Sequence, residues 1–212
     1  SSTTANITAK SLTVSGITAS SKTYDGSTSA TLTGTAVYSG LVSGDIFTGS
    51  YTGVFANANV GTGKTVNITS SYSGADVNNY SVTDQSSTTA DISAKALTAT
   101  ASASNKTYDG GTTASTTLTF TGLVGTETLG QTVGSTFDNK NVGSNKTVTV
   151  NSITLADGSG LAANYSISAG QTTTANVTAK ALTVSGITAS NKTYDGSTNV
   201  TLTGTAVYSG LV

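Results

Sequence analysis

The chain has 212 residues and a formal net charge of −1, and 9% of its residues are charged, whereas an ordinary soluble domain has about 25%. Without a basic patch to neutralise phosphates, nucleic-acid binding and attachment to anionic membranes are not expected. Histidine and cysteine are absent, which excludes thiolate nucleophiles, Ser-His-Asp triads, disulfides and the usual zinc ligand sets. We therefore expect no enzyme activity, no cofactor and no metal ion. No apolar run approaches the roughly 20 residues of a membrane-spanning helix, so we expect no membrane insertion.

A five-residue phrase, Lys-Thr-Tyr-Asp-Gly, occurs three times along the chain. Its copies provide the candidate site residues Lys22, Tyr24, Asp25 and Gly26, then Lys106, Tyr108, Asp109 and Gly110, and then Lys192, Tyr194, Asp195 and Gly196. A lysine that opens a Leu-Thr strand recurs at Lys10, Lys95 and Lys180, at a constant spacing. Self-similarity at such a period indicates an array of like units.

The period divides the chain into residues 1–9, 10–94, 95–179 and 180–212. Residues 1–9 match the end of the later units and are predicted to be the closing strand of a preceding repeat. The two central ranges are expected to be complete β repeats. The last range is a partial repeat that is identical to 10–42 at 29 of 33 positions. We therefore expect the chain to be a window onto a longer array.

Within the units, apolar and polar residues alternate with period two, which predicts half-buried strands and no helices. In the first unit Leu12 and Val14 alternate with polar residues, and Leu32, Gly34, Ala36 and Tyr38 share one face. Further strands are expected at 46–55, at Val66 and Ile68, at Tyr80 and Val82, and at Ala90 and Ile92. The second unit repeats this scheme with Leu97, Leu118 and Phe120, Val148 and Val150, Tyr165 and Ile167, and Ala175 and Val177. Threonine and valine suit these positions because branching at Cβ fits a pleated strand.

Many short strands separated by Gly, Asn, Asp and Ser turns predict an all-β protein of tandem immunoglobulin-like antiparallel β-sandwich repeats of about 85 residues. A β-grasp-like unit is the alternative. A β-solenoid would show a rung period of about 20–30 residues, which the sequence lacks. From Thr88 to Thr98 one unit runs into the next without a Gly/Ser/Pro linker, so neighbouring units are expected to be held stiffly, as in a rod.

The Tyr-Asp-Gly phrase has a structural interpretation and a functional one. In the structural interpretation the tyrosine fills the core with its hydroxyl bonded to backbone, the aspartate caps a turn, and the glycine takes a positive φ. In the functional one Tyr24 and Asp25 contact a ligand or metal. One carboxylate per site is too few for Ca²⁺, which takes about six to eight oxygens.

A second phrase, Asn-x-Asn-Val-Gly-x-x-Lys-Thr-Val, occurs at 57–66 and 139–148. It predicts a turn followed by a strand, with Val60 and Val142 buried. Lysine and asparagine at fixed positions also raise the alternative of a Lys-Asn isopeptide bond. That reaction needs a buried acid beside the pair, for which Glu127 and its counterpart Asp45 are the candidates.

Several motifs in a specific order resemble a known family. They are Lys-Thr-Tyr-Asp-Gly, Gly-Leu-Val-Ser-Gly-Asp at 40–45, Asn-Val-Gly at 59–61, Asn-Tyr-Ser-Val at 79–82 and the closing Thr-Ala-Asp-Ile-Ser-Ala-Lys. Together they resemble the YDG and "mostly β, glycine-rich" repeats of large bacterial surface proteins of the filamentous-haemagglutinin-like adhesin class. The second unit departs from the pattern at 122–127, where it reads Gly-Leu-Val-Gly-Thr-Glu. The resemblance implies extracellular display and a β-rich stalk, and it carries no catalytic residues or ligand.

We accordingly expect a structural segment of a long secreted bacterial repeat protein, forming a stiff stalk or filament on the cell surface. The expected partners are neighbouring repeats of the same chain. The alternatives are that the repeats themselves bind a glycan, host or matrix protein, or that they associate laterally through sheet edges into a fibre or sheath.

Overall fold

The computed structural model describes residues 1–212, and the protein is all-β, which confirms the predicted fold class. The only helical elements are two three-residue 3-10 turns, η1 (Val77–Asn79) and η2 (Ala162–Asn164). No helix has the length and apolar content needed to cross a membrane.

The chain forms two compact units that cut across the sequence repeats. Unit 1 consists of Ser1–Thr98, Thr121–Gly130 and Leu155–Ile167, and unit 2 consists of Ala99–Phe120, Gln131–Thr154 and Ser168–Val212. Two segments of the second repeat thus belong to the same compact unit as the whole first repeat. These two segments provide the site described below.

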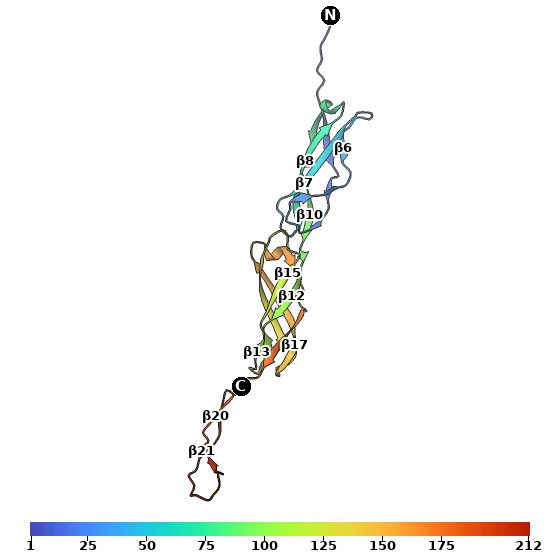
Figure 1. Ribbon diagram of the computed structural model, residues 1–212. Helices are drawn as coiled ribbons and strands as arrows, with labels where there is room; N and C mark the ends of the chain where they lie inside the picture. The colour runs from blue at the N-terminus through green and yellow to red at the C-terminus, as the bar shows by residue number, and fades with distance from the viewer. The chain divides into compact units, whose positions relative to one another are not determined.

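The first repeat contains ten strands, several of only two residues. They are β1 (Lys10–Ser15), β2 (Thr18–Ala19), β3 (Lys22–Thr23), β4 (Ser29–Ala30), β5 (Leu32–Thr33), β6 (Val37–Ser39), β7 (Thr48–Phe55), β8 (Gly61–Ser73), β9 (Tyr80–Thr83) and β10 (Ser87–Ser93). A five-stranded sheet has the order β3-β10-β8-β7-β4, and a three-stranded sheet has the order β6-β1-β9. Strands β7, β8 and β10 lie side by side in Figure 1.

The longest pairing is the antiparallel hairpin of β7 and β8, whose register runs from Thr48 opposite Ser73 to Phe55 opposite Val66. The sheets are not antiparallel throughout, since β1 pairs in parallel with β9 and β10 pairs in parallel with β3. Both parallel pairs join segments that are far apart in the sequence, because parallel strands need a long connection. Strand patterning alone does not reveal such pairs.

The core of the first repeat lies between the two sheets. Val14 of β1 and Ile17 pack with Ile68 of β8, so the three-stranded sheet contacts the five-stranded one. A second cluster contains Leu12, Phe47 and Tyr80. The predicted inward residues of β1 and β8 are therefore buried, and their face-to-face packing makes this repeat a β-sandwich.

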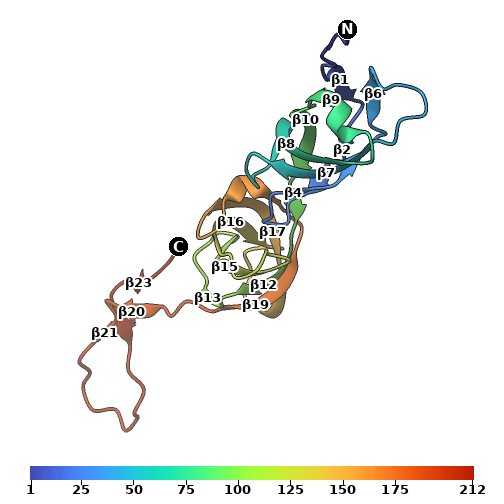
Figure 2. The same cartoon turned by 90° about the horizontal axis from the view of Figure 1, so that it is seen from above.

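The second repeat follows the same plan. Its strands are β11 (Lys95–Ala96), β12 (Thr98–Ala103), β13 (Lys106–Thr107), β14 (Thr113–Ala114), β15 (Thr116–Thr121), β16 (Leu129–Phe137), β17 (Gly143–Asp157), β18 (Tyr165–Ser166) and β19 (Thr172–Thr178). The five-stranded sheet has the order β13-β19-β17-β16-β14, which repeats the order in the first repeat strand for strand. Figure 2 shows β17 and β19 within this repeat.

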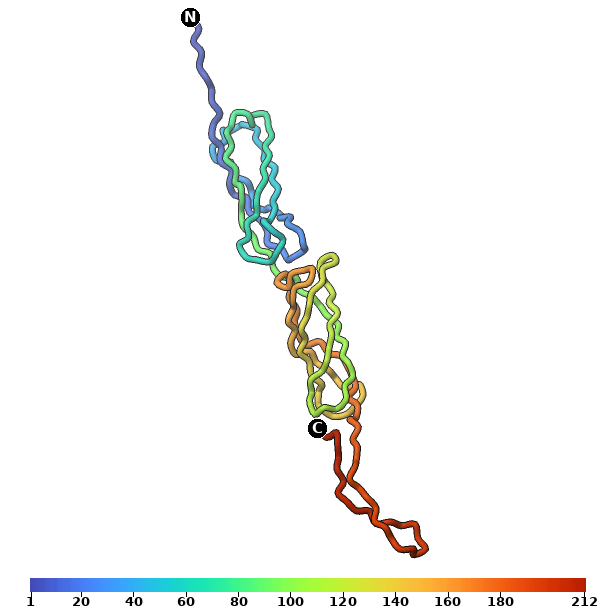
Figure 3. The backbone as a smooth tube through the Cα atoms, turned by 90° about the vertical axis from the view of Figure 1, so that its left-hand side faces the viewer, coloured from blue at the N-terminus to red at the C-terminus, as the bar shows by residue number.

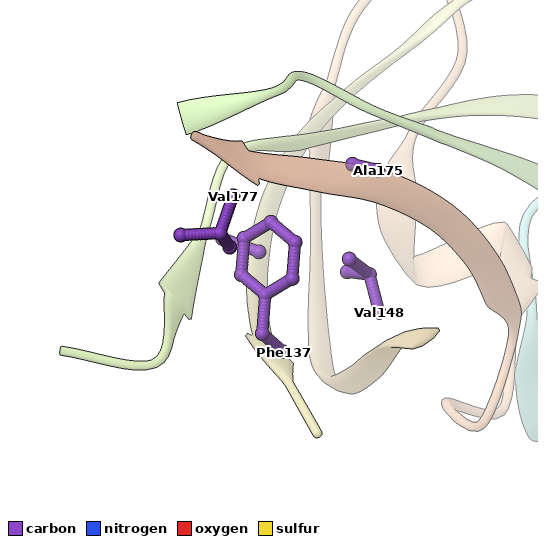
Figure 4. Close-up of a cluster of buried hydrophobic side chains, with 5 residues drawn as sticks. Phe137, Val148, Ala175 and Val177 are labelled. Atoms are coloured by element: carbon purple, nitrogen blue, oxygen red, sulfur yellow. The ribbon is translucent and has the colours of Figure 1, made fainter. Parts of the chain in front are cut away.

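A compact apolar cluster lies on one face of that sheet (Figure 4). Phe137 from β16, Val148 from β17, and Ala175 and Val177 from β19 point toward one another there. A threonine or an asparagine precedes each of them along its strand, as the period-two pattern predicts.

A glutamine side chain completes the backbone pairing in each complete repeat. The Gln85 amide accepts a hydrogen bond from the Ile17 N–H (3.0 Å) and donates one to the Ile17 carbonyl. Gln131 does the same for Leu118, at 3.1 and 2.8 Å. Each glutamine amide thus pairs with both the N–H and the carbonyl of one backbone residue, as a neighbouring strand would. Buried backbone polar groups need such partners.

Residues 180–212 form short ladders, in which β20 (Thr183–Ser185) pairs with β23 (Val207–Ser209) and β21 (Thr188–Ala189) with β22 (Leu202–Thr203). Their local pairing copies that of β1 with β6 and of β2 with β5. Leu182 is 49% exposed, whereas its counterpart Leu12 is fully buried. Figure 3 shows this segment as an open hairpin, and shows residues 1–9 extended without strand pairing. Residues 1–9 form no strand pairing here, and a strand requires a hydrogen-bonded neighbour. Their assignment as the closing strand of a preceding repeat stays a prediction.

Candidate repeat-docking site

In each copy the lysine of the Lys-Thr-Tyr-Asp-Gly phrase holds the loop together through hydrogen bonds to residues of that loop. Lys22 Nζ donates to the Asp25 carboxylate (2.8 Å) and to the carbonyls of Ser27 (2.8 Å) and Ser29 (3.1 Å), and it lies 5.6 Å from the Phe55 ring centroid. The second copy repeats this arrangement with Asp109, Gly111, Thr113 and Phe137 around Lys106. In the third copy Lys192 binds Asp195 and Ser197. The lysine is therefore the centre of a charge-assisted clamp.

The aspartate of each phrase closes the turn from the other side. Asp25 Oδ1 accepts a hydrogen bond from the Ser27 N–H at 2.8 Å, across Gly26 with a φ of 77°. Gly110 and Gly196 also have positive φ, at 80° and 72°, which glycine adopts without a steric penalty. The lysine hydrogen bond holds the pKa of Asp25 below its usual value, and the pKa values of Asp109 and Asp195 are lowered for the same reason.

Within unit 1, the first phrase contacts a socket from the second repeat, which we define as Val124, Glu127, Asn164 and Tyr165. The Tyr24 hydroxyl donates to Glu127 Oε1 at 2.7 Å, and the Tyr165 hydroxyl donates to Glu127 Oε2 at 2.6 Å. The two tyrosine rings meet edge to face, with centroids 5.4 Å apart and planes at 80°. A Cβ built on Gly26 would lie 2.9 Å from Val124 Cγ1, so only glycine permits this approach.

Asn164 completes the socket from the 3-10 turn η2. Its Oδ1 accepts a hydrogen bond from the Val60 N–H (2.9 Å), and its Nδ2 donates to Asn59 Oδ1 (3.1 Å). The side chain is only 1% exposed, and a buried amide is stable when its polar atoms are paired in this way. The second repeated phrase, at 57–66, is therefore also part of the contact.

The socket has a distinct electrostatic signature. The hydrogen bond to the Glu127 carboxylate, followed by burial, raises the pKa of Tyr24 from 10.0 to about 12. Burial first, and then the same carboxylate, raises the pKa of Tyr165. Both tyrosines therefore stay protonated as hydrogen-bond donors well above neutral pH.

The three phrase tyrosines lie in different surroundings. Tyr24 is 6% exposed, Tyr108 is half-buried against the Phe137 cluster, and Tyr194 is 93% exposed. The expectation that the hydroxyl bonds to backbone is wrong for Tyr24, whose partner is the Glu127 carboxylate. The physical reason is that an ionised carboxylate is a stronger acceptor than a carbonyl.

The second repeated phrase forms the predicted turn, since the Asn57 and Asn139 side chains each accept a hydrogen bond from the N–H two residues on. The expected burial of Val142 is wrong, because this residue is 54% exposed, and Val60 is only half-buried. Asn164 binds the Val60 N–H, whereas no hydrogen bond of this kind covers the Val142 turn.

The lysines of this phrase also bind the turn. Lys64 Nζ lies 2.7 Å from Asn57 Oδ1, and Lys146 Nζ lies 2.6 Å from Asn139 Oδ1. Asp138 forms an ion pair with Lys146 at 2.9 Å, and Lys146 lowers the pKa of this carboxyl. Glu127, the acid considered for isopeptide formation, lies instead between Tyr24 and Tyr165.

Sequence reasoning did not connect the phrase with Glu127, Asn164 and Tyr165, which lie in the following repeat, far from Tyr24 along the chain. A signal was available in the period, since Asn79-Tyr80 recurs as Asn164-Tyr165 at the same spacing as the opening lysines. A repeated polar and aromatic pair next to a turn is consistent with a contact made once per repeat.

The socket contacts the first phrase and the 57–66 turn through hydroxyl, amide and carboxylate hydrogen bonds and through packing of tyrosine rings. No group of three or more acidic side chains gathers where a metal ion could be held. The site is suited to holding a protein loop through hydrogen bonds and ring packing.

The fold and this contact define a tandem all-β repeat protein in which a recurring turn of one repeat contacts the next. Comparison with family models identifies the repeat: the YDG domain model matches residues 8–90, 93–175 and 178–212. The chain therefore belongs to the YDG domain family, with three tandem copies. Searches of curated proteins and of solved structures gave no match.

Proposed function

We propose that the chain is a structural segment of a long extracellular bacterial protein of the filamentous-haemagglutinin-like adhesin class, acting as a stiff stalk on the cell surface. The observation that carries the proposal is the contact of Tyr24, Glu127 and Tyr165, in which side chains from two successive repeats share one compact unit. A stalk holds its far end away from the cell surface only if successive repeats resist bending.

The link between the repeats supports the same proposal. Strand β10 ends at Ser93 and β11 begins at Lys95, so only Ala94 separates them. A one-residue link, together with hydrogen bonds on both Tyr24 and Asn164, leaves little freedom for the segments within unit 1 to swing.

The two alternative functions have less support. A binding face for a glycan or protein would expose aromatic side chains together, but Tyr51 and Tyr72 are half-buried and pack on each other with ring centroids 6.2 Å apart. The edge strands β3 and β4 of the five-stranded sheet have two residues each, and such short edges offer a poor template for lateral pairing.

Electron microscopy of the native protein, with immunogold labelling against residues 1–212 on the producing cells, tests the proposal. We expect label on the outer surface and thin single-chain rods with beads every few nanometres in the purified protein. Label confined to the cell interior would contradict the surface role. Thick fibres with many chains side by side would show instead that lateral assembly is the function.

A further inference from the structure

Two tyrosines of the first repeat meet hydroxyl to hydroxyl between the two sheets of its sandwich. Tyr38 lies on β6 of the three-stranded sheet, and Tyr51 lies on β7 of the five-stranded sheet. The Tyr51 hydroxyl donates a hydrogen bond to the Tyr38 hydroxyl oxygen at 3.0 Å. The same Tyr38 oxygen accepts a hydrogen bond from the Gly49 N–H at 2.9 Å. The two phenols are therefore held in direct contact.

A glycine in β7 makes room for this pair. A Cβ built on Gly49 would collide with the hydroxyl groups of both Tyr38 and Tyr51. Gly49 does not have a positive φ, so glycine is needed at this position for space and not for its backbone conformation. A glycine inside a strand weakens the strand and often marks a close approach of other groups. Here the approaching groups are the two hydroxyls.

The fold itself does not require two phenols at these positions. In the second repeat Phe120 takes the place of Tyr38, Val133 takes the place of Tyr51, and Gln131 takes the place of Gly49. The five-stranded sheet of that repeat nevertheless has the same strand order. An apolar pair is therefore sufficient to fill this part of the sandwich, whereas half-buried hydroxyls must be paired with one another. Packing alone does not explain the tyrosine pair.

Neighbouring rings hold the two phenols in place. Phe47 packs against Tyr38 with ring centroids 5.2 Å apart, and Tyr72 packs against Tyr51 with centroids 6.2 Å apart. Burial first, and then the hydrogen bond to Tyr38, raises the pKa of Tyr51. This phenol is therefore protonated near neutral pH and gives up its proton when it is oxidised. Both tyrosines remain half-exposed, so small oxidants can reach them.

We propose that Tyr38 and Tyr51 form an oxidative cross-linking site, at which an oxidant of the peroxide class joins the two side chains through an ether bond. Each phenol loses one hydrogen atom, as an electron and a proton, and becomes a phenoxyl radical. The Tyr51 oxygen bonds to the Tyr38 ring carbon next to its hydroxyl-bearing carbon, and the hydrogen displaced from that carbon returns to the Tyr38 oxygen. Hydrogen peroxide accepts the two hydrogen atoms as its O–O bond breaks, which yields two molecules of water.

The new bond connects the two sheets of the sandwich. It links β6 to β7 and closes a loop over residues 38–51, so it constrains the unfolded chain as a disulfide does. The chain has no cysteine, and the tyrosine pair provides a covalent link that does not need thiols. This inference goes beyond the proposed stalk, because the site lies within one repeat and requires no second chain.

Peptide mapping after oxidation tests the proposal. The chain is treated at low concentration with hydrogen peroxide and a haem peroxidase, and it is then cleaved after lysine. Fragment 23–64 contains both Tyr38 and Tyr51, because no lysine lies between them. We expect this fragment to become lighter by two hydrogen atoms and to give no sequence ions between the linked residues. Fragment 107–140 of the second repeat, which lacks the phenol pair, should not show this loss.

Substitutions that remove one hydroxyl and keep the ring locate the bond. Tyr38→Phe and Tyr51→Phe should each abolish the mass loss in fragment 23–64. Tyr72→Phe is the matched control, because Tyr72 belongs to the same group of rings but donates its hydroxyl to Asp84, and this chain should cross-link like the wild type. An unchanged fragment 23–64 in the oxidised wild-type chain, or the same mass loss in Tyr51→Phe, would overturn the proposal.

Oxidation of the chain in urea separates the folded geometry from the general reactivity of phenols. Without their fixed contact the two phenols meet rarely, so we expect the linked fragment to form about tenfold less in the unfolded chain. In the folded chain, cross-linking should shift the urea midpoint of unfolding to a higher concentration. Equal yields of linked fragment in the folded and unfolded chains would show that the structure does not direct the reaction, and would also overturn the proposal.

Discussion

At the scale of single residues, the Tyr-Asp-Gly turn depends on a lysine that lies two positions before its tyrosine. Lys22 brings together one carboxylate and two carbonyl groups that would otherwise lack a strong donor. Its side chain is largely buried while Asp25 is half-exposed, so the carbonyl contacts contribute more than the ion pair, which is screened by solvent. The sequence showed that this lysine recurs, and the structure showed what it binds.

Replacing Lys22 with methionine removes the donor while keeping the length of the side chain. We expect a loss of about 1–3 kcal/mol in the free energy of unfolding, because two carbonyls and a carboxylate lose their partner. Urea denaturation followed by tyrosine fluorescence measures it. The control is Lys10→Met at an exposed lysine without a hydrogen bond, where we expect a change within about 0.5 kcal/mol. An equal effect of both substitutions would rule out the clamp.

Glu127 is the residue that links two tyrosines from different repeats. In the Glu127→Gln chain the pKa of Tyr24 should fall from about 12 toward 10.0, because the neutral amide no longer favours the protonated phenol. Titration of the Tyr24 Cζ signal by NMR measures this shift. Asp84→Asn is the matched control, since Asp84 accepts a hydrogen bond from Tyr72 and not from Tyr24. An unchanged Tyr24 titration in Glu127→Gln would contradict the described contact.

At the scale of elements, strand β7 shows how the alternation of side chains between the two faces of a strand decides which of them contribute to stability. Phe55 is 1% exposed and Val54, its neighbour, is 46% exposed. Both are apolar, so composition does not separate them, whereas the period of two assigns them to opposite faces. The alternation also predicted the inward residues of β1, β8, β10 and β17. It did not predict β2, β3 and β4, which are too short to show a pattern.

Truncation of these two neighbours should have unequal effects. We expect Phe55→Ala to lower the free energy of unfolding by about 3–5 kcal/mol, because it leaves a cavity in the core and removes the ring next to Lys22. Val54→Ala should cost less than about 1 kcal/mol, mainly through lower strand propensity. Urea denaturation of both variants provides the comparison, and similar losses would mean that the register of β7 with β8 is incorrect.

At the scale of the whole molecule, the shifted groups titrate far from neutrality. Tyr24, Tyr72, Tyr80 and Tyr165 have raised pKa values, so the folded chain keeps protons that the unfolded chain loses above about pH 10. Asp25, Asp109, Asp138 and Asp195 have lowered pKa values, so their contribution is present above about pH 3.8 and is lost as the pH falls further.

Stability should therefore be nearly constant between about pH 5 and 9, and should fall as the pH rises above about 10 or drops below about 4. With 9% charged residues and no histidine, few other groups titrate or are screened in this window. Thermal unfolding across this pH range, at low and high salt, measures it. A midpoint that moves strongly between pH 5 and 9 would contradict this expectation.

The period, the all-β class, the turn glycines and the faces of the longer strands can be predicted without a structure, because they follow from local rules of spacing and backbone conformation. Which copies of a residue are buried is known only from the tertiary packing. Residues 10–42 and 180–212 are nearly identical, yet Leu12 is buried while Leu182 is half-exposed. Tyr24 and Tyr194 differ in the same way. Burial depends on the strands and sockets that cover a side chain, and these come from segments in distant parts of the sequence, including the following repeat.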